Sequence, residues 1–273
     1  MVITSYHPIY TFYSQRESRG GYHNFHLRKT LEINILWYFY IRNFFGPDCD
    51  ILIIDQNSDY SIQEFLNRVK EPYDISDVKD FSYDKNLKLH IKQFHTKRLI
   101  CGGCKRMYHY CYKFCHFNNL DFFFVENDCI VARNLLEECR NIDFATNNID
   151  QKHRVCDTWI NFISKSRLKE HDVLMPLDKF YDSIVEKYDR EEMGSHEVFS
   201  HDIVTDRIDV ASTIMNERGA YMKYCYGDIL TFNNDRVFHG ESNDKLIKFL
   251  KENKINHPYY DYFLENAERI DCK

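Results

Sequence analysis

Two carboxylates separated by one residue follow a hydrophobic run in the middle of the chain. The run is Phe122 to Val125, and Glu126 and Asp128 come directly after it. Extended geometry would place both side chains on the same face, where two like charges are costly unless a partner compensates them. A hard divalent cation does so through oxygen ligands, and it can hold a diphosphate leaving group. The pattern predicts a Mn²⁺ or Mg²⁺ site, with a solvated turn at the end of the strand as the alternative.

A second cluster of short polar side chains also follows a hydrophobic run. Residues 51–54 read ILII, and residues 55–59 read DQNSD. Ligands of open parallel sheets bind beyond the carboxyl ends of the strands, so Asp55 and Asn57 are candidates to hydrogen-bond a base or ribose. The same residue types also make strand-to-helix turns and cap helices, which is the alternative for this cluster.

Taken together, the two clusters resemble those of the glycosyltransferases with the GT-A fold. The second strand of that superfamily ends in a motif such as DDxSxD, to which residues 55–59 are similar, with Gln56 where an acid is common. The metal motif of the superfamily is DxD, with ExD among its variants, and Glu126-Asn127-Asp128 is similar to the ExD form. The resemblance covers residues 2–150 and implies a nucleotide-sugar-binding domain.

The resemblance also implies roles for residues outside the two motifs. A late histidine completes the metal shell in many GT-A enzymes, and His239, followed by Gly240, is similar to it. Basic residues in the segment that opens the helix before the metal motif are expected to contact the nucleotide phosphates. An ordinary loop histidine and a solvated helix face are the alternatives. The expected nucleotide-binding residues are Asp55, Asn57, Arg98, Lys105, Asn127 and Lys245.

A catalytic base is expected well after the metal motif. An inverting transferase needs a carboxylate that takes the proton of the acceptor hydroxyl, whereas a retaining enzyme does not. Asp202 is the preferred candidate and Glu197 the second, both in a segment that also contains Asp206. Each of the three is also compatible with an ordinary surface carboxylate.

The cysteines near residue 100 require a separate interpretation. Cys101, Cys104, Cys111 and Cys115-His116 follow the spacing C-x2-C-x6-C-x3-C-H. Structural zinc sites usually have a longer loop between two ligand pairs. Cys111 and Cys115 are also four residues apart, which suggests one buried helix face. A zinc site is therefore the weaker alternative.

The elements that must position these residues alternate between strand and helix in the first half. Strands are expected at residues 2–13, 50–54, 87–94 and 121–125, and helices at 25–45, 61–70, 104–117 and 133–140. In the second half, helices are expected at 156–168, 177–189, 204–218, 243–252 and 258–268, and strands at 221–232. This order predicts an α/β, Rossmann-like fold with a mostly parallel central sheet flanked by helices. Residues 1–150 would bind the nucleotide sugar, and residues 151–273 would form a mixed acceptor-side region of the same compact unit.

Composition narrows the class of protein. The 273 residues are 44% hydrophobic and 16% aromatic, which is enough for a substantial core. The net charge is −6 without a basic block, so nucleic acid is not an expected partner. No apolar run reaches about 18 residues, and the first residues do not resemble a signal peptide. The ten cysteines indicate a reducing compartment, so we expect a cytoplasmic protein.

These features predict a metal-dependent glycosyltransferase. It would move a sugar from a UDP- or GDP-sugar donor to a hydroxyl of a glycan acceptor. A nucleotidyltransferase is the alternative enzyme, although a glycine-rich phosphate loop near the first strand is missing. A non-catalytic binding or interaction module is the alternative outside the enzymes.

Overall fold

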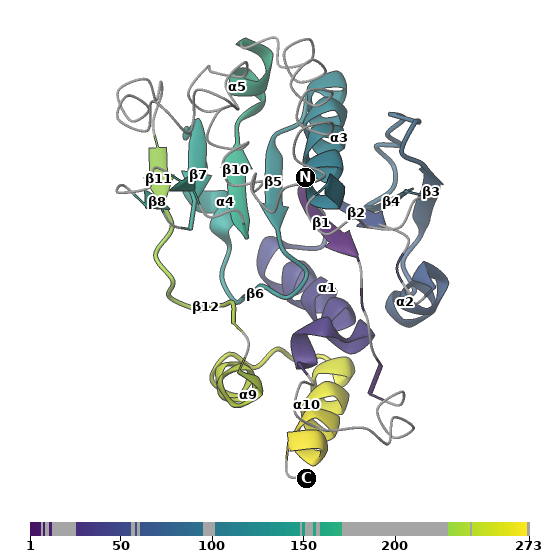
Figure 1. The fold of residues 1–273 in the computed structure, drawn as a ribbon, viewed down its shortest axis with the longest axis vertical. Helices are drawn as coiled ribbons and strands as arrows, with labels where there is room; N and C mark the ends of the chain where they lie inside the picture. Colours follow the sequence, from purple (N-terminus) through teal and green to yellow (C-terminus); the bar gives the residue numbers. More distant parts are fainter. Residues whose placement is uncertain are drawn as a thin grey trace.

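The computed structural model describes most of the first half of the chain and its C-terminal helices. The described residues are 1–6, 8, 11–12, 26–55, 58, 61–94, 102–147, 149–150, 155–156, 159–170, 229–240 and 242–271. Within them lies an eight-stranded sheet with the strand order β11-β7-β10-β5-β1-β2-β4-β3 (Figure 1). Its strands are β1 (Val2–Tyr6), β2 (Ile51–Asp55), β3 (Tyr73–Asp77), β4 (Leu89–Gln93), β5 (Phe122–Val125), β7 (Phe144–Thr146), β10 (Ile160–Ile163) and β11 (Ile229–Thr231).

The sheet is mostly parallel, as the sequence predicts. Strands β1, β2, β3, β4 and β5 run in one direction, while β10 pairs antiparallel with both β5 and β7. The α/β class is therefore confirmed. Strands β10 and β11 belong to the same sheet as β1, so the sheet crosses residue 150 without interruption.

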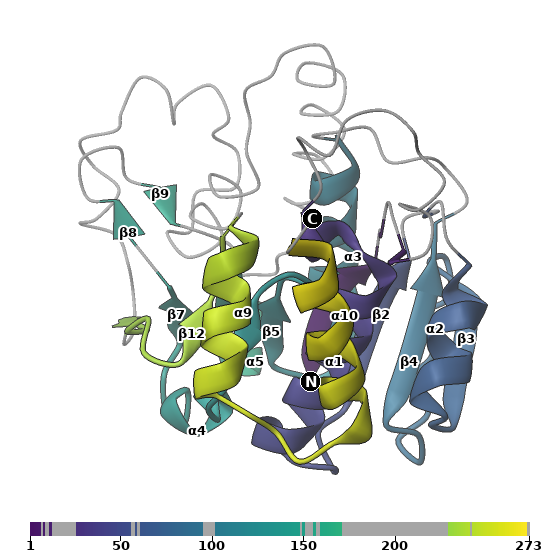
Figure 2. The same cartoon turned by 90° about the horizontal axis from the view of Figure 1, so that it is seen from below.

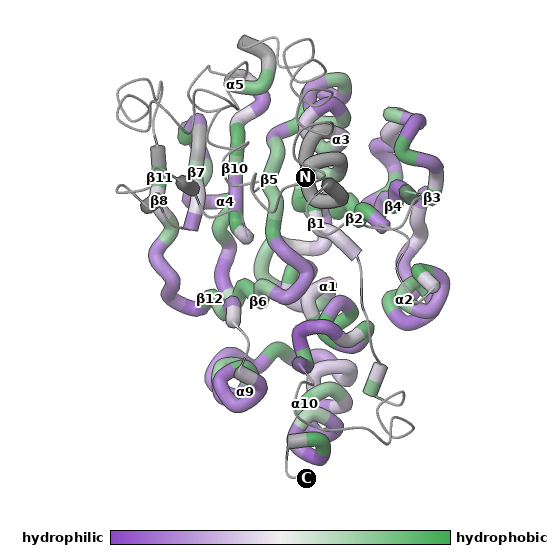
Figure 3. The backbone as a smooth tube through the Cα atoms, in the orientation of Figure 1, coloured by the Kyte–Doolittle hydropathy of each residue, from purple (hydrophilic) through white to green (hydrophobic). Residues whose placement is uncertain are grey.

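Helices cover both faces of the sheet (Figures 1 and 2). One hydrophobic layer joins the sheet to α1 (Leu31–Phe45), α2 (Ile62–Val69), α9 (Asn243–Glu252) and α10 (Pro258–Asp271). The other joins it to α3 (Gly102–Asn118) and α5 (Lys165–Glu170). Figure 3 shows that hydrophobic residues predominate along β5, in the middle of the sheet, whereas α2 and α9 alternate hydrophobic and hydrophilic residues, as amphipathic helices do.

The expected helix ends are found where the sequence supplies capping residues. The Thr30 hydroxyl accepts a hydrogen bond from the backbone of Ile33 and caps α1, while Ser242 caps α9 in the same way. Helix α1 ends at Gly46, whose φ of 94° suits a residue without a side chain. No helix among the described residues has the length and hydrophobicity needed to cross a membrane.

One expected element is wrong. The apolar spacing predicts a helix at residues 156–168, but Ile160–Ile163 form β10, and only Lys165–Glu170 are helical. All four residues of β10 are buried between β5 and β7. A short apolar run that is covered on both faces has no period that separates strand from helix, so the sheet neighbours decide its structure. Residues 177–189 and 204–218 lie outside the described residues.

A buried carboxylate in the first turn of α1 leads to a stability prediction. Glu32 is 4% exposed, and its Oε2 has no hydrogen-bond partner within the described part of the chain. Burial raises the pKa of Glu32 above 4.5, while backbone hydrogen bonds and Arg68 oppose this effect. The stability that protonation contributes is complete below pH 4.5 and is lost as the pH rises through the raised pKa.

Glu32→Gln is therefore expected to stabilise the protein at pH 7 by about 1 kcal/mol, because the amide carries no buried charge. The gain should shrink as the pH approaches 4.5. Urea unfolding at pH 5 and pH 7 measures both effects. The exposed Glu265→Gln serves as the control and should change the stability little at either pH. A destabilised Glu32→Gln at pH 7 would contradict the interpretation.

Candidate metal centre

The loop after β5 brings two carboxylates together. The backbone N–H of Cys129 donates to the carbonyl of Glu126 at 3.0 Å, which closes a turn over residues 126–129. The N–H of Glu126 donates to the carbonyl of Trp159 at 2.9 Å, which ties the turn to the segment that precedes β10. Glu126 and Asp128 therefore converge through a turn. The expectation of extended geometry was wrong, because residues 126–129 form a hydrogen-bonded turn between β5 and β6 (Ile130–Val131).

Asn127, between the two carboxylates, points into the protein interior. It is 5% exposed, and its amide donates to Oδ1 of Asn34 at 2.8 Å. Asn34 on α1 in turn donates to the carbonyl of Thr30 at 2.8 Å. The side chain of Asn127 anchors the turn to α1, and its expected contact with the nucleotide stays a prediction. A buried amide without such a partner would be costly.

His239 reaches the same loop through a short antiparallel ladder. Strand β12 (Val237–Phe238) pairs with β6, and Phe238 lies opposite Ile130. This register places the next residue, His239, beside the turn. Its Nε2 lies 3.2 Å from Oε2 of Glu126 and 3.8 Å from Oδ1 of Asp128. The structure thus brings together the three residues that the sequence predicts as metal ligands.

The three side chains form a donor set suited to a divalent cation. One ligand atom from each of Glu126, Asp128 and His239 lies within 4.8 Å of the others, and no other such cluster of three occurs in the part of the chain that the structure describes. Two carboxylate oxygens and an imidazole nitrogen suit Mn²⁺. They also suit Mg²⁺, although Mg²⁺ has a stronger preference for oxygen ligands. The donor set therefore fits the predicted cofactor.

The electrostatics of the cluster show an unbalanced negative charge. Burial, reinforced by the neighbouring Glu126, raises the pKa of Asp128 to about 6, although His239 and Arg28 act in the opposite direction. Burial lowers the pKa of His239, but the hydrogen bond with Glu126 and the charge of Asp128 outweigh it, so the net shift is upward. Both shifts mean that the carboxylates would gain from a further positive charge.

Arg28 is a member of the site that the sequence analysis missed. Its Nη1 lies 3.5 Å from Oδ2 of Asp128, and its side chain is 21% exposed. Arg28 lies on the short 3-10 helix η3 (Leu27–Lys29), which is held because the N–H of Leu27 donates to Oδ1 of Asn243 at 3.0 Å. A hundred residues separate Arg28 from Asp128, and no local pattern marks the pair.

Trp159 supports the site from the side. Its ring stacks on the His239 imidazole with centroids 4.5 Å apart and planes 13° apart. Its carbonyl also accepts the hydrogen bond from Glu126, so Trp159 contacts two of the three candidate ligands. Stacking restricts the rotation of the imidazole and keeps its nitrogen directed at the carboxylates.

This contact supplies a spectroscopic prediction. The chain has only two tryptophans, and Trp37 is buried in α1. Titration with paramagnetic Mn²⁺ is expected to quench the Trp159 component of the emission, because the cation would bind next to the stacked imidazole. Trp159→Phe should abolish the quenching, and Trp37→Phe should preserve it. Quenching that persists in Trp159→Phe would place the Mn²⁺ elsewhere.

Asp55 is held firmly at the carboxyl end of β2. It is 6% exposed, its Oδ1 accepts from the N–H of Ser58 at 3.2 Å, and its Oδ2 accepts from the amide of Gln93 at 3.0 Å. Tyr6, the last residue of β1, pairs in register with Asp55. The order β5-β1-β2 places Asp55 two strands from β5, and the spacing between these two strands is about 10 Å.

The structure describes only some of the other predicted nucleotide-binding and catalytic residues. Lys245 is exposed in the first turn of α9, three residues after the Ser242 cap. Lys105 belongs to α3, but its side chain is outside the described part of the structure. Asn57, Arg98, Glu197 and Asp202 lie outside the described residues.

The cysteines of α3 favour a buried face over a zinc site. Cys111 and Cys115 are both buried in the hydrophobic layer beneath α3. Burial raises the pKa of the Cys115 thiol to about 12 and that of Cys111 well above its usual range. Thiolate ligands are therefore disfavoured at these two positions. Cys101 is outside the described residues.

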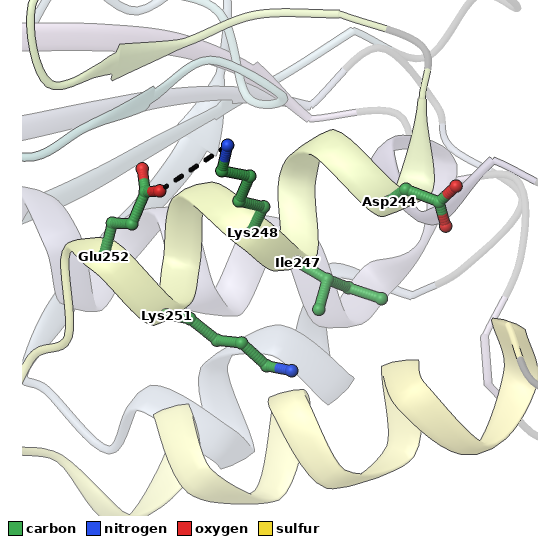
Figure 4. Close-up of a pocket in the computed structure, with 5 residues that line it drawn as sticks. All are labelled: Asp244, Ile247, Lys248, Lys251 and Glu252. Atoms are coloured by element: carbon green, nitrogen blue, oxygen red, sulfur yellow. Dashed lines mark ion pairs between the residues drawn. The ribbon is translucent and has the colours of Figure 1, made fainter.

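A separate surface hollow lies over α9 (Figure 4). It is lined by Asp244, Ile247, Lys248, Lys251 and Glu252, and it shares no residue with the metal cluster. Lys248 pairs with Glu252 at 3.9 Å, and Lys251 pairs with Glu268 at 2.5 Å. Its lysines are neutralised locally, so the hollow is an ordinary solvated helix face of mixed charge.

Comparison with known proteins leaves the function to be argued from the site. No family model and no curated protein matches the chain. A nucleoside-diphosphate-sugar pyrophosphorylase from Vibrio cholerae RC9 matches at 11% identity and a TM-score of 0.45, over 92% of this chain and 100% of that chain. Residues 1–349 of S. aureus TarS match at 9% identity and a TM-score of 0.45, over 98% and 70% of the two chains. The TarS complex with UDP matches at 10% identity and a TM-score of 0.45, over 100% and 72%. Because these three TM-scores are below 0.5, the matches carry no argument about function, and the functional argument rests on the cluster itself.

Proposed function

We propose that the protein is a metal-dependent glycosyltransferase that uses a UDP- or GDP-sugar donor. The observation that carries the proposal is the convergence of Glu126, Asp128 and His239 at the carboxyl end of β5. Ligands of open parallel sheets bind at this edge. The cluster combines that location with a donor set suited to Mn²⁺ or Mg²⁺.

The spacing between β5 and β2 supports an elongated ligand that contacts the carboxyl ends of both strands. Strand β1 lies between β5 and β2, so the strand spacing alone separates these two strands by about 10 Å, a span that suits a nucleoside joined to a diphosphate. In this proposal Asp55 and Asn57 hold the nucleoside, and Glu126, Asp128 and His239 hold the cation. Lys245, Arg98 and Lys105 are the proposed basic contacts of the phosphates.

A cation held by these three residues would neutralise the negative charge that develops on the departing diphosphate. The bond between the anomeric carbon and the phosphate oxygen breaks, and a bond from that carbon to the acceptor oxygen forms. The acceptor hydroxyl loses its proton, for which Asp202 is the proposed base and Glu197 the second candidate. Asn127 and Trp159 keep the two carboxylates and the imidazole in place.

Product analysis tests the proposal directly. The protein is incubated with a panel of UDP- and GDP-sugars, Mn²⁺ and candidate glycan acceptors, and the released nucleotides are separated by chromatography. Release of a nucleoside diphosphate, dependent on Mn²⁺ and accelerated by an acceptor, is the expected result. EDTA should abolish it.

Product analysis and a thermal shift assay together distinguish the competing functions. A nucleotidyltransferase would instead release pyrophosphate from a nucleoside triphosphate in the presence of a sugar phosphate. A binding module would bind a donor in a thermal shift assay without releasing any product. No shift and no product with any donor, with Mn²⁺ present, would overturn the proposed function.

A further inference from the structure

Asp128 divides its two oxygens between two different neighbours. Its Oδ1 faces His239 at 3.8 Å and belongs to the candidate ligand set. Its Oδ2 faces Nη1 of Arg28 at 3.5 Å. A permanent cation therefore lies directly beside the site that is proposed to take a divalent cation. An arginine remains charged at any physiological pH.

The net charge of the metal cluster shows how Arg28 affects the binding of a cation and of a phosphate. The two carboxylates and the guanidinium together carry one net negative charge. A divalent cation would convert this to one net positive charge, which attracts a phosphate. Without Arg28 the cation-free cluster would carry two negative charges, and the loaded cluster would be neutral.

We propose that Arg28 couples cation binding to diphosphate binding, so that the site takes a cation–diphosphate complex in preference to a bare cation. This inference rests on the proposed function. Arg28 repels a bare cation and offers its planar guanidinium to the anion that accompanies it. Because coupling is reciprocal, the nucleotide tightens Mn²⁺ binding by the same factor by which Mn²⁺ tightens nucleotide binding.

The chain holds Arg28 in a position where it can act in this way. Helix η3 is joined to the start of α9 by the Leu27–Asn243 hydrogen bond and to α1 by the Thr30 hydroxyl, which donates to the carbonyl of Leu27 at 2.7 Å. A surface ion pair without such support contributes little. Here the backbone next to Arg28 is anchored at Leu27, which keeps the guanidinium within reach of Asp128.

The test measures Mn²⁺ affinity by the electron paramagnetic resonance signal of the free ion, alone and with saturating UDP or GDP. For the wild type, we expect one of the two nucleotides to tighten Mn²⁺ binding by about fivefold or more. Arg28→Gln should bind bare Mn²⁺ more tightly than the wild type and lose most of the nucleotide effect. Arg28→Met should behave in the same way, and Arg28→Lys should retain part of the coupling because it keeps the charge.

The sign of the change separates this role from a structural one. A merely structural arginine would weaken bare Mn²⁺ binding when replaced, and that result would overturn the inference. Unchanged coupling in folded Arg28→Gln and Arg28→Met would also overturn it while leaving the proposed function intact. The exposed Arg140→Gln should match the wild type throughout. A wild type that binds no Mn²⁺, or binds it without any effect of UDP or GDP, would overturn the proposed function and this inference together.

Discussion

Asp128→Asn is expected to lower the rate of metal-dependent donor cleavage by at least about 100-fold. Asp128 contributes an oxygen to the candidate ligand set, and loss of even an outer-shell partner of a metal costs about 10- to 100-fold. Isothermal titration with Mn²⁺ and chromatography of the released nucleoside diphosphate measure binding and turnover on the same preparations. The exposed Asp235→Asn, in the turn before β12, is the matched control and should retain both.

Asp128→Asn should lower the rate of donor cleavage but raise the stability of the metal-free protein. In the absence of metal, burial and Glu126 raise the pKa of Asp128 to about 6, so its charge opposes folding at pH 7. Removing that charge is expected to stabilise the metal-free protein by about 1–2 kcal/mol. Mn²⁺ should then stabilise the wild type but not Asp128→Asn. A variant that is still stabilised by Mn²⁺ would exclude Asp128 as a ligand.

Phe123→Ala should cause the largest loss of stability, about 3–5 kcal/mol in urea unfolding. Phe123 lies in the middle of β5 without solvent exposure. Its ring is 5.8 Å from that of Phe45 on α1, 6.0 Å from that of Phe162 on β10, and 6.3 Å from that of Phe232, which follows β11. The cavity would therefore remove contacts between the first half of the chain and the strands that follow residue 150.

Two further variants make this prediction specific. Phe123→Leu preserves most of the volume and should cost about 1–2 kcal/mol. Phe117→Ala replaces a side chain that is 56% exposed and should change the stability by less than about 0.5 kcal/mol. A single unfolding transition in all three variants is expected. Two separate transitions in Phe123→Ala would show that the regions before and after residue 150 unfold independently.

Local patterns account for most of the first half of the fold. The apolar runs at residues 51–54 and 122–125 predict β2 and β5 because a strand covered by helices on both faces must be hydrophobic throughout. Helices α1 and α9 are bounded by capping residues that act on their own backbone. Strand β3, by contrast, was not expected, since its residues are only partly buried and it lies at the edge of the sheet.

The candidate site was predicted in part. Glu126 and Asp128 could be predicted from the sequence alone, because two carboxylates that directly follow an apolar strand need a partner that compensates their charge. His239 was expected only through the GT-A resemblance, and the β6–β12 ladder brings it to within 3.2 Å of Glu126. Its function as a metal ligand remains a proposal that Mn²⁺ titration tests.

What the sequence determines by itself, then, is most of the elements of the first half and the position of the two carboxylates along the chain, because hydrophobic runs, caps and local charges act over a few residues. Only the tertiary structure places Arg28 against Asp128, stacks Trp159 on His239 and turns Asn127 towards Asn34. These contacts join residues that lie 80 to 100 positions apart, such as Asn34 and Asn127, which are separated by 93. Their formation depends on how the helices pack against the sheet, and no local period or spacing records that packing.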